Sequence, residues 1–234
     1  MVALFAVIVA LAFGGSQTTY TQPWHQTAPL AAGGEIEVDN LYGDVVVERG
    51  PDGSVDIAAV KKAYRQGDLD GVGVHVDVVE GAVKVTTDYP SSWHFLHHVD
   101  RWVDYQIRVP AKTKVILRLK YGDGRVESVG GPVDAQTRYG DIEARNAGGD
   151  QYLITEYGDV KLSVVTSDGG HSVTARSTYG DIDVELPATS LPDIEANTRF
   201  GDVNNDFEQT AHAGPKVDLR TTFGDVTISK EFSP

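Results

Sequence analysis

One pattern, an aromatic residue followed by Gly-Asp, recurs along most of this sequence. The aromatic residues of the six later copies are separated by 18, 18, 22, 21 and 23 residues. A motif that returns at a period near 20 residues is typical of proteins built from stacked repeats. The copies, of which the first is an outlier, are Tyr42-Gly43-Asp44, Tyr121-Gly122-Asp123, Tyr139-Gly140-Asp141, Tyr157-Gly158-Asp159, Tyr179-Gly180-Asp181, Phe200-Gly201-Asp202 and Phe223-Gly224-Asp225.

The residues around each copy alternate between apolar and polar, as in a β-strand with one buried face. In the copy at Tyr139 the inward phase runs through Val133 and Ala135, and it restarts at Ile142, three residues after the aromatic. This slip of one residue indicates a corner or a bulge at Gly-Asp.

Each residue of the motif has a physical role at such a corner. The glycine would allow a positive φ or the close approach of a neighbouring repeat. The aspartate would accept hydrogen bonds from backbone N–H groups that the corner frees. We expect the aromatic ring to fill the inside of the corner and to stack on the ring of the next repeat, about 4.8 Å away. Thr or Ser two residues earlier would form a ladder of small side chains.

These features predict an all-β fold, a parallel β-helix (β-solenoid) with rungs of about 18–23 residues. Repeats of this length cannot bury an apolar face alone, and their connections are too short for crossover helices. A β-sandwich is the alternative, while a propeller would need about 40 residues per blade. Because Tyr42 and Tyr121 are 79 residues apart, near four rungs, we expect rungs without the motif in the N-terminal half.

The predicted organisation has four parts. Residues 1–16 form an apolar leader, since Met1–Phe13 matches the core of a signal peptide, although no basic residue precedes it; a buried strand is the alternative. A linker covers 17–32. An N-terminal β region, 33–110, contains degenerate rungs and an aromatic and His-rich loop at 91–103, and we expect Ala58–Gln66 to be extended and Pro110 to end a strand. The regular β-helix covers 111–234.

Charge and composition exclude several functions. The formal net charge is −14 and the pI about 4.8, so neither nucleic acid nor an anionic membrane is an expected partner. The absence of cysteine excludes disulfides, thiolate metal sites, cysteine nucleophiles and a lipoprotein anchor.

The repeated aspartates would lie in one column if the rungs stack in register. We interpret them as corner caps rather than as a calcium site, because each rung supplies only one carboxylate and Ca²⁺ takes six to eight oxygen ligands. We expect basic residues beside the aromatics to offset part of the carboxylate charge; they are Lys120, Arg138 and Arg199.

Three other groups of residues are candidate sites. His94, His97 and His98 have the spacing of zinc ligands on a helix, but a third ligand and the HExxH pattern are missing. Paired carboxylates for glycan cleavage would have to converge, and the candidates are Asp150, Glu156 and Asp168, with Arg176. Trp93, Phe95 and Trp102 are candidate partner contacts or parts of a packed lid.

On these residues the chain resembles an adhesin-like family of bacterial envelope proteins of unknown function, related to the auto-transporter-adhesin-head-like and toastrack-type β-repeat domains. The resemblance covers about 33–233 and rests on Gly34–Val47, on Val103–Pro110 and on the series of motifs, although many members have Asn-Gly or Ser-Gly in place of Tyr-Gly. It implies a single-stranded right-handed β-helix outside the cytoplasm. It supplies no catalytic, metal-binding or cofactor-binding residues.

The sequence therefore predicts a non-catalytic, exported, adhesin-like or scaffold module of the bacterial cell envelope, which displays a rigid surface to an envelope protein or glycan. We expect no enzyme activity and no cofactor, and contact with a membrane only through an uncleaved leader. The alternative is a β-helix that binds or cleaves carbohydrate.

Overall fold

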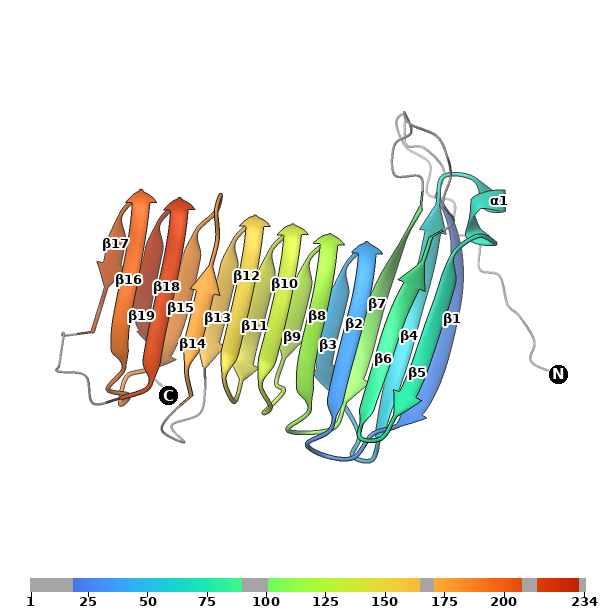
Figure 1. Ribbon diagram of the computed structural model, residues 1–234, viewed down its shortest axis with the longest axis horizontal. Helices are drawn as coiled ribbons and strands as arrows, with labels where there is room; N and C mark the ends of the chain where they lie inside the picture. Colours follow the sequence, from blue (N-terminus) through green and yellow to red (C-terminus); the bar gives the residue numbers. More distant parts are fainter. Residues whose placement is uncertain (1–18, 90–100, 165–170, 208–213, 232–234) are drawn as a thin grey trace.

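The computed structural model describes residues 19–89, 101–164, 171–207 and 214–231, and these form two long β-sheets packed face to face (Figure 1). The 10-stranded sheet has the order β1-β4-β7-β3-β9-β11-β13-β15-β19-β17, and the 9-stranded sheet the order β16-β18-β14-β12-β10-β8-β2-β6-β5. Each rung contributes one strand to each sheet, so the chain winds around a flattened solenoid.

The strands from the N-terminal half are β1 (Tyr20–Pro29), β2 (Glu35–Tyr42), β3 (Val45–Arg49), β4 (Ser54–Ala63), β5 (Gly73–Val79), β6 (Ala82–Asp88) and β7 (Arg101–Val109), and one short helix, α1 (Gln66–Leu69), follows β4. The strands of the repeat region are β8 (Lys114–Tyr121), β9 (Gly124–Glu127), β10 (Val133–Tyr139), β11 (Ile142–Ala147), β12 (Gln151–Tyr157), β13 (Val160–Val164), β14 (Val173–Arg176), β15 (Ile182–Pro187), β16 (Asp193–Phe200), β17 (Val203–Asn205), β18 (Lys216–Phe223) and β19 (Val226–Glu231).

Parallel pairing joins successive rungs in both sheets. Val133 of β10 pairs with Val115 of β8 on one side and with Gln151 of β12 on the other, offsets of 18 residues. The prediction of a solenoid with parallel strand pairing is therefore confirmed. The alternative, a β-sandwich, is correct only in that two sheets face each other. The described strands of the repeat region pair in parallel and not as the hairpins of a sandwich.

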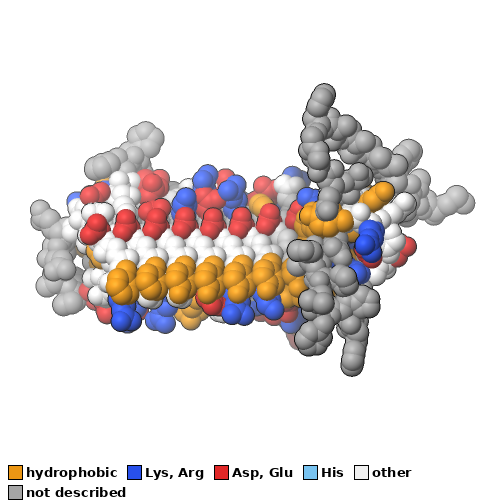
Figure 2. Space-filling view, turned by 90° about the horizontal axis from the view of Figure 1, so that it is seen from above, with side chains coloured by type: hydrophobic (Ala, Val, Ile, Leu, Met, Phe, Trp, Pro, Cys, Tyr) orange, Lys and Arg blue, Asp and Glu red, His pale blue; other side chains and the backbone are white. Residues whose placement is uncertain are grey.

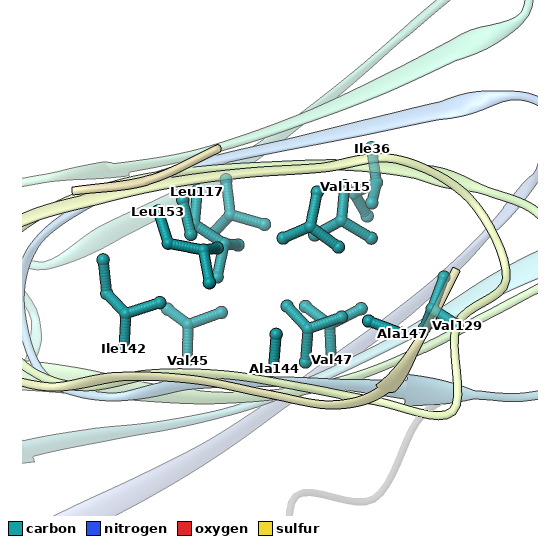
Figure 3. Packing of buried hydrophobic residues seen from close by; sticks show 14 of the residues in the cluster. Ile36, Val45, Val47, Val115, Leu117, Val129, Ile142, Ala144, Ala147 and Leu153 are labelled. Carbon is teal, nitrogen blue, oxygen red and sulfur yellow. The ribbon is translucent and has the colours of Figure 1, made fainter. Parts of the chain in front are cut away.

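The core lies between the two sheets and consists of the inward residues of each rung (Figure 3). Leu117 and Leu153 of the 9-stranded sheet point toward Val45 and Ile142 of the 10-stranded sheet, and all four are at most 2% exposed. The apolar alternation in the sequence thus corresponds to inward positions, and the corner at Gly-Asp moves the chain from one sheet to the other.

The last two rungs are exchanged relative to their order in the sequence. β14 pairs with β18, not with β16, and β16 pairs only with β18 among the described strands. The chain therefore leaves β15, builds the outermost rung β16/β17, and returns to place β18/β19 between that rung and the rest of the stack.

The spacing argument for the N-terminal half is wrong. β2 pairs directly with β8, and Tyr42 is in register with Tyr121, so these copies are neighbours rather than four rungs apart. Among the described strands, only β6 and β7 form a rung without the motif, since they run parallel to β2 and β3. The remaining strands are antiparallel: β5 pairs with β6, β4 with β7, and β1 with β4.

The predicted linker at 17–32 is also wrong, because Tyr20–Pro29 forms β1 along the whole of β4. β1 is the outer strand of its sheet, so only Ala28 on it is buried and the usual alternation is missing. Its Pro23 is compatible with an edge position, where one side of the strand needs no ladder donor. Ala58–Gln66 is extended up to Ala63 and ends in α1, and Pro110 follows the last residue of β7.

Candidate interaction surface along the rung corners

The seven motif aromatics form one continuous column of stacked rings at the corners of the rungs. Neighbouring ring centroids are 4.8–5.2 Å apart, with interplanar angles of 2–10°. This column is called the aromatic ridge, and its order is Tyr42, Tyr121, Tyr139, Tyr157, Tyr179, Phe223 and Phe200. The predicted stacking on the next rung is confirmed.

The aromatic ridge lies on the surface, not inside the corner as the sequence analysis expected. Tyr121 is 38% exposed, Tyr157 40% and Phe200 54%, and the rings appear as an unbroken orange row in Figure 2. The inward phase ends two residues earlier, at buried positions such as Thr137 and Thr155. Because neighbouring rings cover both faces of each inner ring, the surface displays ring edges and tyrosine hydroxyl groups.

The glycine of the motif is required by the neighbouring rung. Gly140 has φ +153°, and a Cβ atom on it would lie 2.2 Å from the carbonyl oxygen of Gly122. Real Cβ atoms do not approach a backbone oxygen so closely, so any side chain would push two rungs apart. Both reasons given by the sequence, the positive φ and the close approach, therefore apply at this corner.

The aspartates form a ladder of hydrogen bonds that runs parallel to the aromatic ridge. In each step the backbone N–H of one motif aspartate donates to the Oδ1 of the aspartate in the adjacent rung, at 2.8–3.1 Å. The ladder, called the Asp ladder, contains Asp104, Asp44, Asp123, Asp141, Asp159, Asp181, Asp225 and Asp202. The predicted capping of backbone N–H groups is confirmed, and Asp104 extends it into the rung without the motif.

Partial burial raises the pKa of Asp123, and the neighbouring carboxylates of Asp44 and Asp141 raise it further, whereas the N–H of Asp141 opposes the shift. The aspartate column therefore carries an electrostatic cost that the backbone donors offset in part. The described part of the chain contains no group of three or more His, Asp or Glu side chains placed to hold a metal ion.

Thr and Ser residues complete the corner from the inside. Thr155 Oγ1 donates to the carbonyl oxygen of Gly140 at 2.9 Å, and Thr137 donates in the same way to Gly122 at 3.1 Å. These residues form the expected ladder of small side chains, and each hydroxyl also satisfies the glycine carbonyl of the adjacent rung. In the first rung Asn40 takes this place and donates to three carbonyls, among them that of Gly43.

The basic residues before the aromatics do not neutralise the aspartates. The charged groups of Lys120, Arg138 and Arg199 lie 5.3–5.4 Å from the centroids of the rings that follow them in sequence. Arg138 also pairs with Glu156 at 2.8 Å. Figure 2 shows a row of acidic side chains along one side of the aromatic ridge and mostly basic side chains beside the rings on the other.

Among the described residues, the other candidates do not assemble into a site. Asp150 directly precedes β12 and Glu156 is its penultimate residue, so the two carboxylates lie at opposite ends of one strand. Arg176 pairs with Asp218 at 3.5 Å. Trp102 lies half-buried on β7 with its ring 5.3 Å from that of Tyr64. Trp93, Phe95, Asp168, His94, His97 and His98 lie outside the described residues, as do the leader at 1–16 and most of the predicted loop at 91–103.

A feature that the sequence analysis missed is a groove of about 540 Å³ on the outer face of the 10-stranded sheet. It crosses β11, β13, β15 and β19, and its polar lining consists of Glu143, Arg145, Lys161, Ser163, Asp183, Glu185, Thr227 and Ser229. Partial burial raises the pKa of Asp183, while Lys161 opposes the shift. In the sequence, this groove could have been found from the polar residues after each motif, which alternate with the core residues and therefore share the outer face of the sheet.

No helix among residues 19–89, 101–164, 171–207 and 214–231 combines the length and apolar character that a membrane span needs.

No curated protein gave a significant match to the sequence. The chain matches two solved structures. One is a putative cell adhesion protein from Clostridium sporogenes ATCC 15579, with a TM-score of 0.53 and 11% identity over 90% of this chain and 100% of that one. The other is a putative adhesin from Bacteroides fragilis NCTC 9343, with a TM-score of 0.46 and 12% identity over 92% of this chain and 98% of that one.

The first of these supports the fold alone, because the identity is so low. The family comparison reaches further, since Toastrack DUF4097 matches residues 104–229, more than half of the chain. The matched region begins in β7 and contains the six later copies of the motif. With its fold and the matched repeat region both of this type, the chain belongs to the Toastrack DUF4097 family.

Proposed function

We propose that this protein is a non-catalytic, exported, adhesin-like or scaffold module of the bacterial cell envelope. Its mechanism is the display of a rigid surface to an envelope protein or glycan. The observation that carries the proposal is the aromatic ridge, an exposed row of rings fixed in register by the glycines and the Asp ladder. We also propose that the chain winds around the solenoid with a right hand and that each rung has about 18–23 residues.

The chemistry of the aromatic ridge favours a protein partner over a stacked sugar. Sugar rings pack against aromatic faces, but within the ridge these faces are covered by neighbouring rings at 4.8–5.2 Å. Ring edges carry a positive potential and prefer carbonyl oxygens, carboxylates or the faces of other aromatic rings. A rigid surface also loses little conformational entropy when it binds.

A pull-down from bacterial envelope fractions tests this proposal with two matched variants. Tyr157 lies in the aromatic ridge and Tyr152 lies on the outer face of the 9-stranded sheet, and both are 40% exposed. We expect Tyr157→Ser to reduce capture of the envelope component and Tyr152→Ser to leave it unchanged. Equal capture by the two variants would show that the aromatic ridge is not the contact surface.

The groove on the 10-stranded sheet supports a second candidate, the binding of a glycan. Its lining of carboxylates, cations and hydroxyl groups provides the donors and acceptors that sugar hydroxyls need. Binding on a glycan array that is lost in Lys161→Ala and kept in Lys84→Ala, a change on the other sheet, would favour this candidate. Cleavage is not proposed, because Asp150 and Glu156 do not converge on one groove.

A further inference from the structure

We propose that the open end of the stack at β16 and β17 is a homodimer interface, in which β16 pairs antiparallel with β16 of a second copy. The two ends of the solenoid differ. At one end β5 closes the 9-stranded sheet and β4 and β1 close the other, with antiparallel pairing. At the other end the parallel strands β16 and β17 are the last of their sheets, and no described strand pairs with their outer edges.

The last rung has the sequence of an inner rung, but its apolar residues are not buried. Val203 is 43% exposed, whereas the residues at the same position in the inner rungs, Val160 and Val226 among them, are 0–2% exposed. Ile194 and Ala196 are only half-buried, and Leu191 beside them is 63% exposed. Terminal repeats of a solenoid normally present a polar outer face. The polar inward residue that distinguishes this rung from the inner rungs is Asn205, which pairs in register with Ile228.

The exposed strand edge favours a second copy as the occupant. Antiparallel pairing about Asn197 places Glu195 opposite Arg199 of the partner subunit, and the partner's Glu195 opposite Arg199. Both residues lie exposed on the same outward face of β16, where Glu195 also pairs with Arg220 of β18 at 2.7 Å, and directly opposite side chains of the two copies would lie about 5 Å apart. The same register brings Ile194, Ala196 and Val203 of both copies to one junction.

The capped end limits the assembly to two chains. A head-to-tail filament would have to pair the β16 and β17 edges with β5 and β1, which end their sheets as antiparallel strands, and in β1 Pro23 and Pro29 cannot donate to a ladder. Pairing of two identical edges about a twofold axis is closed and uses up the only open parallel end among the described strands. The aromatic ridge ends at Phe200 in each copy, so the proposal is independent of what the ridge binds.

Light scattering coupled to size-exclusion chromatography tests the proposal on the full chain. We expect the wild-type protein to be a dimer at micromolar concentration and Val203→Lys to be a monomer that still unfolds cooperatively, because Val203 is already partly exposed. A monomeric wild-type protein would overturn the proposal, whether the end is covered from within the chain or by another protein. A dimer that persists in Val203→Lys would place the interface elsewhere and would equally overturn it.

A charge exchange tests the register. Glu195→Arg and Arg199→Glu each place like charges opposite each other in a homodimer, and each should raise the dimer Kd about tenfold or more. An equimolar mixture of the two variants restores opposite charges at both positions and should dimerise as the wild type does. Heterodimer formation also shows that both variants are folded. If the mixture fails to dimerise, the antiparallel pairing about Asn197 is wrong.

Discussion

Two rungs with the same sequence pattern have different environments in this protein. The rung β12/β13 lies inside the stack and buries Val160 completely, whereas β16/β17 lies at the end and leaves Val203 43% exposed. Both rungs contain an aromatic residue, Gly-Asp and a β-branched residue, and both have the same corner hydrogen bonds. The comparison teaches that the pattern fixes the shape of a rung, while its neighbours determine how much each residue stabilises the fold.

The largest effect is expected where a rung has neighbours on both sides. Gly140→Val places a side chain against the carbonyl oxygen of Gly122, at a φ that favours glycine. The clash and the backbone strain together should lower the free energy of unfolding by about 3 kcal/mol or more. Urea denaturation measures this. As a control, Gly53→Val has a positive φ but no atom within 4 Å of the added Cβ, so it should cost less. A neutral Gly140→Val would contradict the corner geometry.

The second prediction compares identical substitutions in the two rungs. Val160→Ala removes two buried methyl groups and should cost about 2–3 kcal/mol in the free energy of unfolding. Val203→Ala should cost less than about 1 kcal/mol, because the side chain already contacts water. Urea denaturation measures both losses under conditions in which dimerisation does not contribute. Val160→Ala is measured in the monomeric Val203→Lys background or at dilution, and Val203→Ala is measured at dilution. Equal losses would mean that the end rung is packed like an inner one.

The third prediction concerns the hydroxyl that caps each glycine carbonyl. Thr155 is 2% exposed and donates to Gly140, so Thr155→Val leaves a buried acceptor without its donor and should cost about 1–2 kcal/mol. Thr198 donates to Gly224 from the half-buried end rung, and water can replace its hydroxyl more easily. Thermal melts of both valine variants should therefore show the larger loss for Thr155→Val. A larger loss for Thr198→Val would reverse the comparison.

The smallest effect is a pH dependence on the outer face of the inner rungs. Burial raises the pKa of Asp183 above 3.8, so between that value and the raised pKa the folded state binds more protons than the unfolded state. Stability contributed by this group therefore falls as pH rises through that window. Asp183→Asn should be slightly more stable than the wild type at pH 7, and the difference should disappear at low pH. Urea midpoints at several pH values measure this, with Asp77→Asn on β5 as the control.

Much of the repeat region could be predicted because its physics is local. The alternation around Val133 and Ala135, and the slip before Ile142, follow from strand geometry, and they correctly indicated strands joined at a corner. The capping role of Asp141 was predictable for the same reason, since a carboxylate beside a freed N–H group accepts from it. The direction of Tyr139 was not, because stacking keeps the ring ordered even at the surface, where a hydrophobic residue was expected to turn inward.

The order of the rungs depended on contacts between distant segments. β16 and β18 have the same pattern, so the sequence does not indicate which of them pairs with β14. Asn205 at an inward position was a weak signal that β17 lies at the end. The same difficulty applies to β1, whose sequence resembles a linker until its pairing with β4 is seen.

The sequence by itself determined the alternation of the strands, the corner at Gly-Asp and the residues that close that corner. These depend on φ, on side-chain alternation and on hydrogen bonds between adjacent rungs that repeat without change. Only the tertiary structure decided the order of the rungs, the antiparallel cap at one end and the exposed edge at the other. These depend on which of several equivalent strand edges meet, and identical edges have nearly identical pairing energies, so the arrangement of the whole chain makes the choice.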